Sequence, residues 1–238
     1  MINNSLEKEI YIGSPTREIN IIMHGFDSSM NSTSVSLLFE RLKLQQSNVI
    51  RFSFRGHGSS VGKLEDTTLD SQIEDLTNVI NFLKEKGYEK FNLFGSSFSG
   101  QVSLFVAEVQ DCVDKVFLKC PLIDGYSHFK NLLGDQKLEQ IYKTDLYVYE
   151  RYNGEKINFK AKFIESFRKN RFDKLKKVFQ KKIILVHGVE DKIVPVGHVQ
   201  ELINILPKEN VMLLKNSGHR IQGPELELLI EFYLKFLN

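Results

Sequence analysis

Short apolar runs recur along the chain and alternate with segments of helical spacing. The runs have the length of buried strands, and they are Glu9–Ile12, Ile19–Met23, Asn48–Phe52, Phe91–Phe94, Lys115–Lys119, Ile183–His187 and Val211–Leu214. Between most of them, apolar residues return every three or four positions, as they do from Val35 to Leu42. Strands that alternate with helices predict an α/β domain, with a mostly parallel sheet of about seven strands flanked by helices. We expect residues 1–238 to form this domain as one unit.

The alternation is interrupted between the fifth and sixth predicted strands, which about sixty residues separate. A crossover helix requires far fewer residues, so we expect residues 121–180 to form a small cap inserted over the C-terminal edge of the sheet. Apolar alternation on both sides of Asn153-Gly154 predicts a hairpin there, and we expect a basic amphipathic helix at 161–177. A crossover connection without a functional role stays open as the alternative.

The predicted cap holds more aromatic residues than solvent exposure would favour, namely Tyr126, Phe129, Tyr142, Tyr147, Tyr149, Tyr152, Phe159, Phe163 and Phe167. Packing of the cap onto the body accounts for most of them. Ligand pockets are lined mainly by apolar and aromatic side chains. We therefore expect some of these residues to contact substrate, with Tyr149 and Phe163 as the candidates.

Two stretches match or nearly match the G-x-S-x-G pattern around the nucleophile of serine hydrolases. Residues 58–62 read G-S-S-V-G, a full match centred on Ser60, and residues 95–100 read G-S-S-F-S-G. A nucleophile elbow requires a tight turn directly between a buried strand and a helix. Ser60 lies in a Gly-rich loop, whereas Ser97 directly follows the strand F-N-L-F-G and precedes a helical pattern. We predict Ser97 as the nucleophile, with Ser99 in place of the second glycine.

A serine nucleophile needs a general base, and in this motif the chain order is serine, acid, histidine. His219 is the predicted base because it follows the last predicted strand, on a loop that reaches the C-terminal edge of the sheet. The other downstream histidines are weaker candidates. His187 and His198 are expected to be structural, and His128 lies in the predicted cap.

The acid and the oxyanion donors are also predicted from their places after strands. Asp191 follows the sixth strand in H-G-V-E-D-K-I-V-P and is the predicted acid. Its neighbour Glu190 would point elsewhere, and Asp124 in P-L-I-D-G remains a weaker alternative. An oxyanion is stabilised by two preorganised donors, and we predict the backbone amides of Phe98, next to the nucleophile, and Phe26, in H-G-F-D after the second strand.

Taken together, these stretches resemble the α/β-hydrolase superfamily, and most resemble its small cinnamoyl (feruloyl) esterases and monoacylglycerol-lipase-like serine hydrolases. The matching stretches, in order from residue 21 to residue 219, are I-I-M-H-G-F, F-R-G-H-G-S-S, G-S-S-F-S-G, H-G-V-E-D-K-I-V-P and S-G-H. The resemblance implies the α/β-hydrolase fold and a Ser-His-Asp triad. Three features depart from the family pattern: Ser53 stands where aspartate is usual, Ser99 replaces a glycine, and the N-terminus is too short for the customary first hairpin. We expect one edge strand to be missing.

These residues leave three functions open. The first is hydrolysis of carboxylic esters through an acyl-enzyme intermediate, and the second is thioester hydrolysis or acyl transfer with the same residues. The third is ligand binding without catalysis, because a fold does not determine a function. Haloalkane dehalogenase chemistry is not expected, because that family uses a carboxylate nucleophile and residue 97 is serine.

Composition narrows the range of partners. Hydrophobic residues make up 42% of the chain and charged residues 26%, as in globular proteins. A net charge of +2 gives no electrostatic basis for binding nucleic acid or an anionic membrane. We expect a small-molecule ester as the partner, with no cofactor and no metal, and a homodimer stays open. Cys112 and Cys120 are expected to be free thiols, and MINNSLEKEI lacks the features of a signal peptide, so a cytoplasmic location is predicted.

Overall fold

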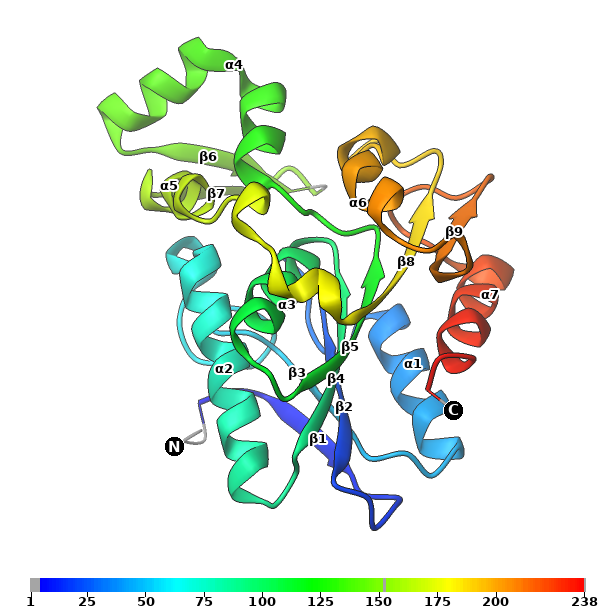
Figure 1. Ribbon diagram of the computed structural model, residues 1–238. Coiled ribbons are helices and arrows are strands. Elements are labelled where there is room, and N and C mark those ends of the chain that lie inside the picture. Colours follow the sequence, from blue (N-terminus) through cyan, green and yellow to red (C-terminus); the bar gives the residue numbers. More distant parts are fainter. Residues whose placement is uncertain (1–4, 152, 238) are drawn as a thin grey trace.

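The computed structural model of the protein describes residues 5–151 and 153–237, and its centre is a seven-stranded sheet (Figure 1). The strands lie in the order β1-β3-β2-β4-β5-β8-β9; β1 is antiparallel to β3, and all other neighbours are parallel. They are β1 (Lys8–Tyr11), β2 (Glu18–Met23), β3 (Val49–Phe52), β4 (Lys90–Ser96), β5 (Val113–Lys119), β8 (Lys182–Gly188) and β9 (Val211–Leu214). The predicted mostly parallel sheet of about seven strands is confirmed.

Helices cover both faces of this sheet, as Figure 1 shows. They are α1 (Thr33–Leu44) and α7 (Gly223–Leu234) on one face, and α2 (Leu69–Glu85), α3 (Phe98–Val109) and α6 (Gln200–Ile205) on the other. Successive side chains of a strand point to opposite faces. In β2, Ile21 and Met23 therefore pack in the core beneath α2 and α3, whereas Ile22 packs beneath α1 and α7. Because both faces are covered, the central strands are mostly apolar, although β2 and β4 each bury an asparagine, Asn20 and Asn92.

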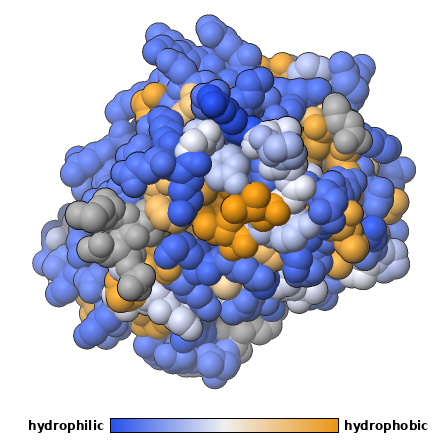
Figure 2. Space-filling model, turned by 90° about the horizontal axis from the view of Figure 1, so that it is seen from below, coloured by the Kyte–Doolittle hydropathy of each residue, from blue (hydrophilic) through white to orange (hydrophobic). Residues whose placement is uncertain are grey.

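The sheet has a free edge at β1. Among residues 5–151 and 153–237, no strand pairs with the outer side of β1. The loss of an edge strand relative to the resembling families stays a prediction. Seen from the N-terminal ends of the parallel strands, the surface is mostly hydrophilic with a small apolar group (Figure 2). Ile12 and Leu44, at the ends of β1 and α1, are exposed apolar side chains. The predicted site residues lie at the opposite edge.

Residues 121–180, which we call the insertion, form six elements between β5 and β8. They are α4 (Gly125–Thr144), β6 (Tyr147–Glu150), β7 (Lys156–Phe159), α5 (Lys162–Lys169), and the 3₁₀ turns η2 (Phe172–Lys174) and η3 (Lys177–Gln180). β6 and β7 pair antiparallel, so the predicted hairpin is confirmed. In Figure 1 the insertion lies above the C-terminal ends of the strands. Tyr152, one of the aromatic residues noted in the sequence, lies outside the described residues.

Two features of the insertion differ from the sequence prediction. The helix expected at 161–177 ends at Lys169, and α4 was not predicted at all. Asn170 ends α5 because its side chain donates hydrogen bonds to Ser166 O and to Asp70 Oδ1, which compete with continued helix. Inside α5, Phe163, Ile164 and Phe167 are buried and the lysines are exposed, as expected for an amphipathic helix.

Candidate active site

Ser97 occupies the turn between β4 and α3. Its backbone has φ 54° and ψ −117°, a region that L-residues rarely adopt. The turn brings strand and helix so close that a Cβ at Gly95 would lie 2.5 Å from Ser103 Oγ and 2.6 Å from Ser99 O. Any larger residue at position 95 would therefore clash with α3, and only glycine fits. This is the strand, tight turn and helix that a nucleophile elbow requires.

Ser99, which replaces the usual glycine, fits the elbow. Its side chain is fully buried, and its Oγ accepts a hydrogen bond from the Ser96 amide at 2.8 Å. The same hydroxyl lies 3.0 Å from Ser96 O, to which it donates. The hydroxyl that serine adds at this position is therefore buried with hydrogen-bond partners inside the turn.

Ser97, His219 and Asp191 form a continuous chain of hydrogen bonds. His219 Nε2 lies 2.9 Å from Ser97 Oγ, and His219 Nδ1 lies 2.7 Å from Asp191 Oδ2. An ionised carboxylate can only accept, so Nδ1 carries the proton and Nε2 accepts from the serine hydroxyl. This tautomer is the one in which the imidazole can take the serine proton.

The Asp191 carboxylate is held in its ionised form. Burial raises its pKa, but hydrogen bonds from His219 and from the Val194 and Ile193 amides outweigh that effect, and the net pKa lies below its ordinary value. The two amides donate to Oδ1 at 2.8 and 2.9 Å, which leaves Oδ2 for His219. The side chain of Asp191 is inaccessible to solvent.

A close backbone approach brings the loops of Asp191 and His219 together. Gly188 ends β8, and a Cβ there would lie 2.3 Å from Ser217 O and 2.5 Å from Gly218 O. Glu190 N–H donates to Ser217 O at 2.9 Å. Because Gly188 has no side chain, the loop that carries Asp191 can contact the loop that carries His219.

The alternative acids and bases have other partners. Asp124 caps α4 by accepting from the Ser127 amide at 3.1 Å, and it pairs with Arg171 at 2.7 Å. Glu190 is exposed. His187 Nε2 lies 2.9 Å from Val194 O, and His198 Nε2 lies 3.3 Å from the Asp124 amide nitrogen. None of these contacts involves Ser97. His128 is a separate case because it lines the cavity beside Ser97.

Ser60, the centre of the full sequence match, is a buried structural residue. Its Oγ donates to Ser53 O at 2.6 Å and accepts from the Glu7 amide at 2.9 Å. Both hydrogen-bonding roles of the hydroxyl are thereby used within the loop that follows β3. The structure does not bring Ser60 into contact with His219.

Ser53 stands where the families that this chain resembles usually have an aspartate. Glu7 supplies a carboxylate beside it. Ser53 Oγ donates to Glu7 Oε2 at 2.7 Å and accepts from the Met30 amide at 3.0 Å. The Ser59 amide donates to the same carboxylate oxygen at 3.1 Å. These hydrogen bonds, that of Ser53 foremost, hold the pKa of Glu7 below its ordinary value of 4.5.

Replacing Glu7 with alanine is expected to lower the free energy of unfolding by about 1–3 kcal/mol, since two hydrogen bonds to a charged acceptor are lost. Because the folded pKa is below 4.5, the stabilisation is complete above that pH and is lost as the pH falls through the folded pKa. Urea unfolding of wild type, Glu7→Ala and Glu7→Gln at pH 7 and pH 3 measures both effects. Glu7→Gln should lose less because it keeps an acceptor, and an equal loss at both pH values would contradict the role of the charge.

His24 ties the loop after β2 to the loop after β3. His24 Nε2 accepts from the Phe54 amide at 3.1 Å, so its proton is on Nδ1, which donates to Gly25 O at 2.7 Å. Burial and the neighbouring His57 lower the pKa of His24 to about 3, and the ring stays neutral at physiological pH. A Cβ at Gly25 would lie 3.2 Å from Ser97 Cβ, so the loop backbone passes directly beside the serine.

Phe26 and Phe98, the predicted oxyanion donors, both line the cavity that contains Ser97. Phe98 begins α3, so its amide is one of the N–H groups that a helix leaves without an internal partner. The two rings pack edge to face with centroids 5.8 Å apart. The structure brings both residues to Ser97, and the role of their amides stays a prediction.

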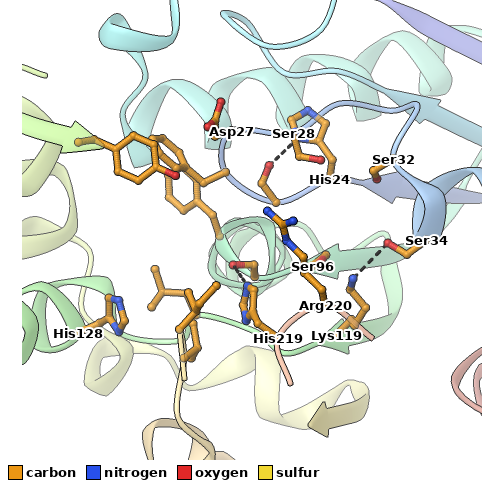
Figure 3. Close-up of a pocket in the computed structure, with 18 of the residues that line it drawn as sticks. His24, Asp27, Ser28, Ser32, Ser34, Ser96, Lys119, His128, His219 and Arg220 are labelled. Carbon is orange, nitrogen blue, oxygen red and sulfur yellow. Dashed lines mark hydrogen bonds between the residues drawn. The ribbon is translucent and has the colours of Figure 1, made fainter. Parts of the chain in front are cut away.

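A cavity of about 670 Å³ opens beside Ser97 at the C-terminal edge of the sheet. Aromatic residues of the insertion line one side, namely Phe129, Tyr147, Tyr149, Phe163 and Phe167. The other side is polar and includes Ser32, Ser34, Lys119 and Arg220. In Figure 3, His128 lies on one side of His219, and Lys119 and Ser34 lie on the other. Of the sequence candidates, Tyr149 and Phe163 both reach this cavity.

An ion pair ties the insertion to the loop that carries Phe26. Arg151, next to the end of β6, donates from Nε to Asp27 Oδ2 at 2.9 Å and from Nη2 to Asp27 Oδ1 at 2.5 Å. Its Nη1 donates to Glu155 Oε2 at 2.6 Å. The Phe26 ring also packs against Tyr149, with centroids 5.3 Å apart. This contact was not predicted, because Asp27 and Arg151 are far apart in the sequence.

One group of side chains has the composition of a metal site. Ligand atoms of Cys120, His187 and Asp191 lie within 4.8 Å of one another, and all three residues are buried. Burial raises the pKa of the Cys120 thiol to about 12, which keeps it protonated, and the Asp191 oxygens already accept hydrogen bonds. Both oxygens of Asp191 are thus occupied by hydrogen bonds, one from the Val194 amide and one from His219.

Comparisons with known proteins agree with this geometry. A family model described as "Serine aminopeptidase, S33" matches residues 14–172. The palmitoyl-protein thioesterase ABHD10, mitochondrial, of Bos taurus is 27% identical over 218 residues, which cover 88% of this chain and 70% of that protein. The uncharacterized protein YfhR of Escherichia coli is 22% identical over 237 residues, which cover 95% of this chain and 74% of that protein.

Two solved structures share the fold. A putative hydrolase from Agrobacterium vitis S4 has a TM-score of 0.84 and 23% identity, over 98% of this chain and 93% of its own. Est1E from Butyrivibrio proteoclasticus, bound to ferulic acid, has a TM-score of 0.81 and 21% identity, over 98% and 94%. At these identities the likeness shows the fold. Together with the family model, which matches most of the chain, these findings show that the protein belongs to the serine aminopeptidase S33 family of α/β hydrolases.

Proposed function

We propose that the protein is a serine hydrolase that cleaves carboxylic esters of small to medium acyl or aryl groups. The observation that carries this proposal is the hydrogen-bonded chain from Ser97 through His219 to the buried Asp191. Ser97 lies on a strained turn at the floor of a cavity, the position from which a nucleophile can reach a bound carbonyl. Membership in a hydrolase family supports the same reaction class.

In the proposed reaction, Ser97 Oγ attacks the ester carbonyl while His219 Nε2 accepts its proton. The amides of Phe26 and Phe98 stabilise the oxyanion that forms. His219 then donates the proton to the leaving alkoxide, and an acyl group remains on Ser97. A water molecule, deprotonated by His219, cleaves this acyl-enzyme, and Asp191 stabilises the imidazolium in both halves of the reaction.

Thioester hydrolysis is the second candidate. It uses the same residues, and it is favoured by the similarity to ABHD10, which is named a palmitoyl-protein thioesterase. The aromatic side of the cavity is compatible with an acyl chain in either reaction.

Both cysteines are free thiols, as expected in a reducing compartment such as the cytoplasm, although ABHD10 is named mitochondrial. No helix among the described residues is both long and apolar enough to cross a membrane.

A fluorophosphonate probe tests the proposal. Covalent labelling of wild type, mapped to Ser97 by mass spectrometry, is the expected result. The values of kcat/KM for butyrate esters and for the matching thioesters then rank the two candidates. A folded protein that takes up no label and cleaves neither substrate would be a binding protein on this scaffold.

Replacing Tyr149 with alanine is expected to change the acyl-chain preference. Tyr149 lines the cavity and packs against Phe26, so its removal takes apolar surface away from a bound chain. Burial of one methylene stabilises by about 0.8 kcal/mol, and we expect kcat/KM for an octanoate ester to fall about fivefold more than for an acetate ester. Tyr142→Ala is the matched control, because Tyr142 lies in the insertion and is 38% exposed.

Phe163 also lines the cavity, but the residue is only 2% exposed and its ring packs against Phe129, Phe159 and Phe167. Phe163→Ala should therefore lower stability by about 3–5 kcal/mol as well as change preference. Equal losses on both esters in Tyr149→Ala would mean that the insertion only stabilises the fold.

A further inference from the structure

Two basic side chains line the polar side of the cavity. Lys119 is the last residue of β5, and Arg220 directly follows His219. Figure 3 shows Lys119 on the same side of His219 as Ser32 and Ser34, away from His128, whereas Arg220 extends from beside His219 toward Ser28. The cavity therefore has an aromatic side that belongs to the insertion, and basic residues that come from the end of β5 and from the loop after β9.

The charge of Lys119 has no counter-ion in the described part of the chain. Its Nζ donates to Ser34 Oγ at 3.1 Å, and no described carboxylate forms an ion pair with it. The charge of Asp191 acts on Lys119 from a distance, but this carboxylate is already hydrogen-bonded to His219. By contrast, Arg151 in the same cavity pairs with Asp27 and Glu155. A partly buried ammonium without an anion is unfavourable, which points to an anion supplied from outside.

The N-terminus of α1 adds to the positive potential. Ser32, Thr33 and Ser34 begin this 12-residue helix and line the cavity. The side chain of Ser32, the N-cap, accepts no capping hydrogen bond, and no acidic residue lies in the first turn. The first amides of a helix and its dipole favour a negative charge at this end.

We propose that Lys119, Ser34, Arg220 and the N-terminus of α1 form an anion subsite, which binds a carboxylate or phosphate group carried by the ester that Ser97 cleaves. This proposal rests on the proposed function, because it places the anion and the ester in one cavity. The aromatic side would hold the apolar part of the same molecule. The substrate class is thus an amphipathic ester with an acidic group, in place of a neutral acylglycerol or aryl ester.

Two matched pairs of esters test the subsite and locate the acidic group. Monomethyl adipate against methyl hexanoate places the carboxylate on the acyl side, and butyryl glycolate against propyl butyrate places it on the alcohol side. Wild type should prefer the acidic member of one pair about tenfold or more in kcat/KM, the range expected of hydrogen bonds to charged groups. The pair that shows the preference identifies the acyl or alcohol side.

Three variants connect that preference to Lys119. Lys119→Met should remove it, mainly through KM, because a charge-assisted hydrogen bond contributes binding and not bond cleavage. Lys119→Arg keeps the charge and should retain most of the preference. Lys115→Met is the matched control, because Lys115 lies on the same strand but pairs with Glu18 and Asp114 away from the cavity.

A binding measurement that needs no activity separates this proposal from the proposed function. Adipate and inorganic phosphate should raise the melting temperature of wild type and Lys119→Arg, but not that of Lys119→Met. No preference in either ester pair, no stabilisation by either anion, or an unchanged response in Lys119→Met would overturn the subsite. Labelling of Ser97 by a fluorophosphonate in such a case would leave the hydrolase proposal standing. Anion binding without labelling would reject the hydrolase proposal alone.

Discussion

Ser97→Ala is expected to abolish ester hydrolysis, with a loss on the order of 10⁴- to 10⁶-fold in kcat. The hydroxyl of Ser97 is the atom that His219 contacts at 2.9 Å, and alanine leaves the imidazole without a nucleophile to activate. The backbone of the elbow can stay unchanged, because the change removes one oxygen atom. Steady-state hydrolysis of a butyrate ester and labelling by a fluorophosphonate both measure the loss, and a melting curve checks the fold.

Ser60→Ala is the control for this prediction, since residues 58–62 match the sequence pattern better than residues 95–100. Ser60 bonds to Ser53 O and to the Glu7 amide, so alanine should lower the free energy of unfolding by about 1 kcal/mol and leave kcat within about threefold. A folded Ser60→Ala protein as inactive as Ser97→Ala would overturn the choice of elbow.

Asp191→Asn is expected to lower kcat by on the order of 10⁴-fold, through the tautomer of His219. The Ile193 and Val194 amides donate to one oxygen of the side chain, so the amide oxygen of asparagine would stay there and its NH₂ would face His219. Nδ1 must then accept, the ring proton moves to Nε2, and the imidazole can no longer take the proton of Ser97. Stopped-flow and steady-state hydrolysis of the same butyrate ester measure the effect.

Asp124→Asn is the matched control, because Asp124 was the alternative acid in the sequence. Its carboxylate caps α4 and pairs with Arg171, so we expect a stability loss of about 1 kcal/mol and little change in kcat. The reverse result, an inactive Asp124→Asn and an active Asp191→Asn, would move the acid to the preceding strand.

Much of the fold and the candidate nucleophile could be predicted because they depend on short-range pattern. A strand buried on both faces is a mostly apolar run, and Gly95-Ser96-Ser97 follows the run F-N-L-F without a gap. The G-x-S-x-G pattern alone favours Ser60. The strand directly before Ser97 and the helix directly after it favour Ser97 instead. In the structure, Ser97 lies between β4 and α3, whereas Ser60 lies in the loop that follows β3.

Other parts depend on contacts that the local pattern does not contain. The apolar positions of α4 do not keep one register, because Gly134 has φ 75° and ψ 161° and breaks the helix into two segments. The carboxylate of Glu7 reaches Ser53 from 46 positions away, and Lys119 reaches Ser34 across 85. A basic residue at the end of a predicted strand was the one available signal for Lys119, since strand ends meet at the site edge of a parallel sheet.

The backbone conformation of Ser97 has a consequence for the timing of the proposed reaction. A residue held at φ 54° and ψ −117° is less stable locally than one in an ordinary region, by about 1–3 kcal/mol. The packed strand and helix around it, through contacts such as those of Gly95, keep it there before any substrate arrives. The entropy of orienting the attacking oxygen is therefore lost once, when the chain folds, and does not recur with each molecule of ester. The strain at Ser97 therefore lowers the free energy of unfolding, and the activation free energy of the proposed reaction no longer includes the cost of orienting this oxygen.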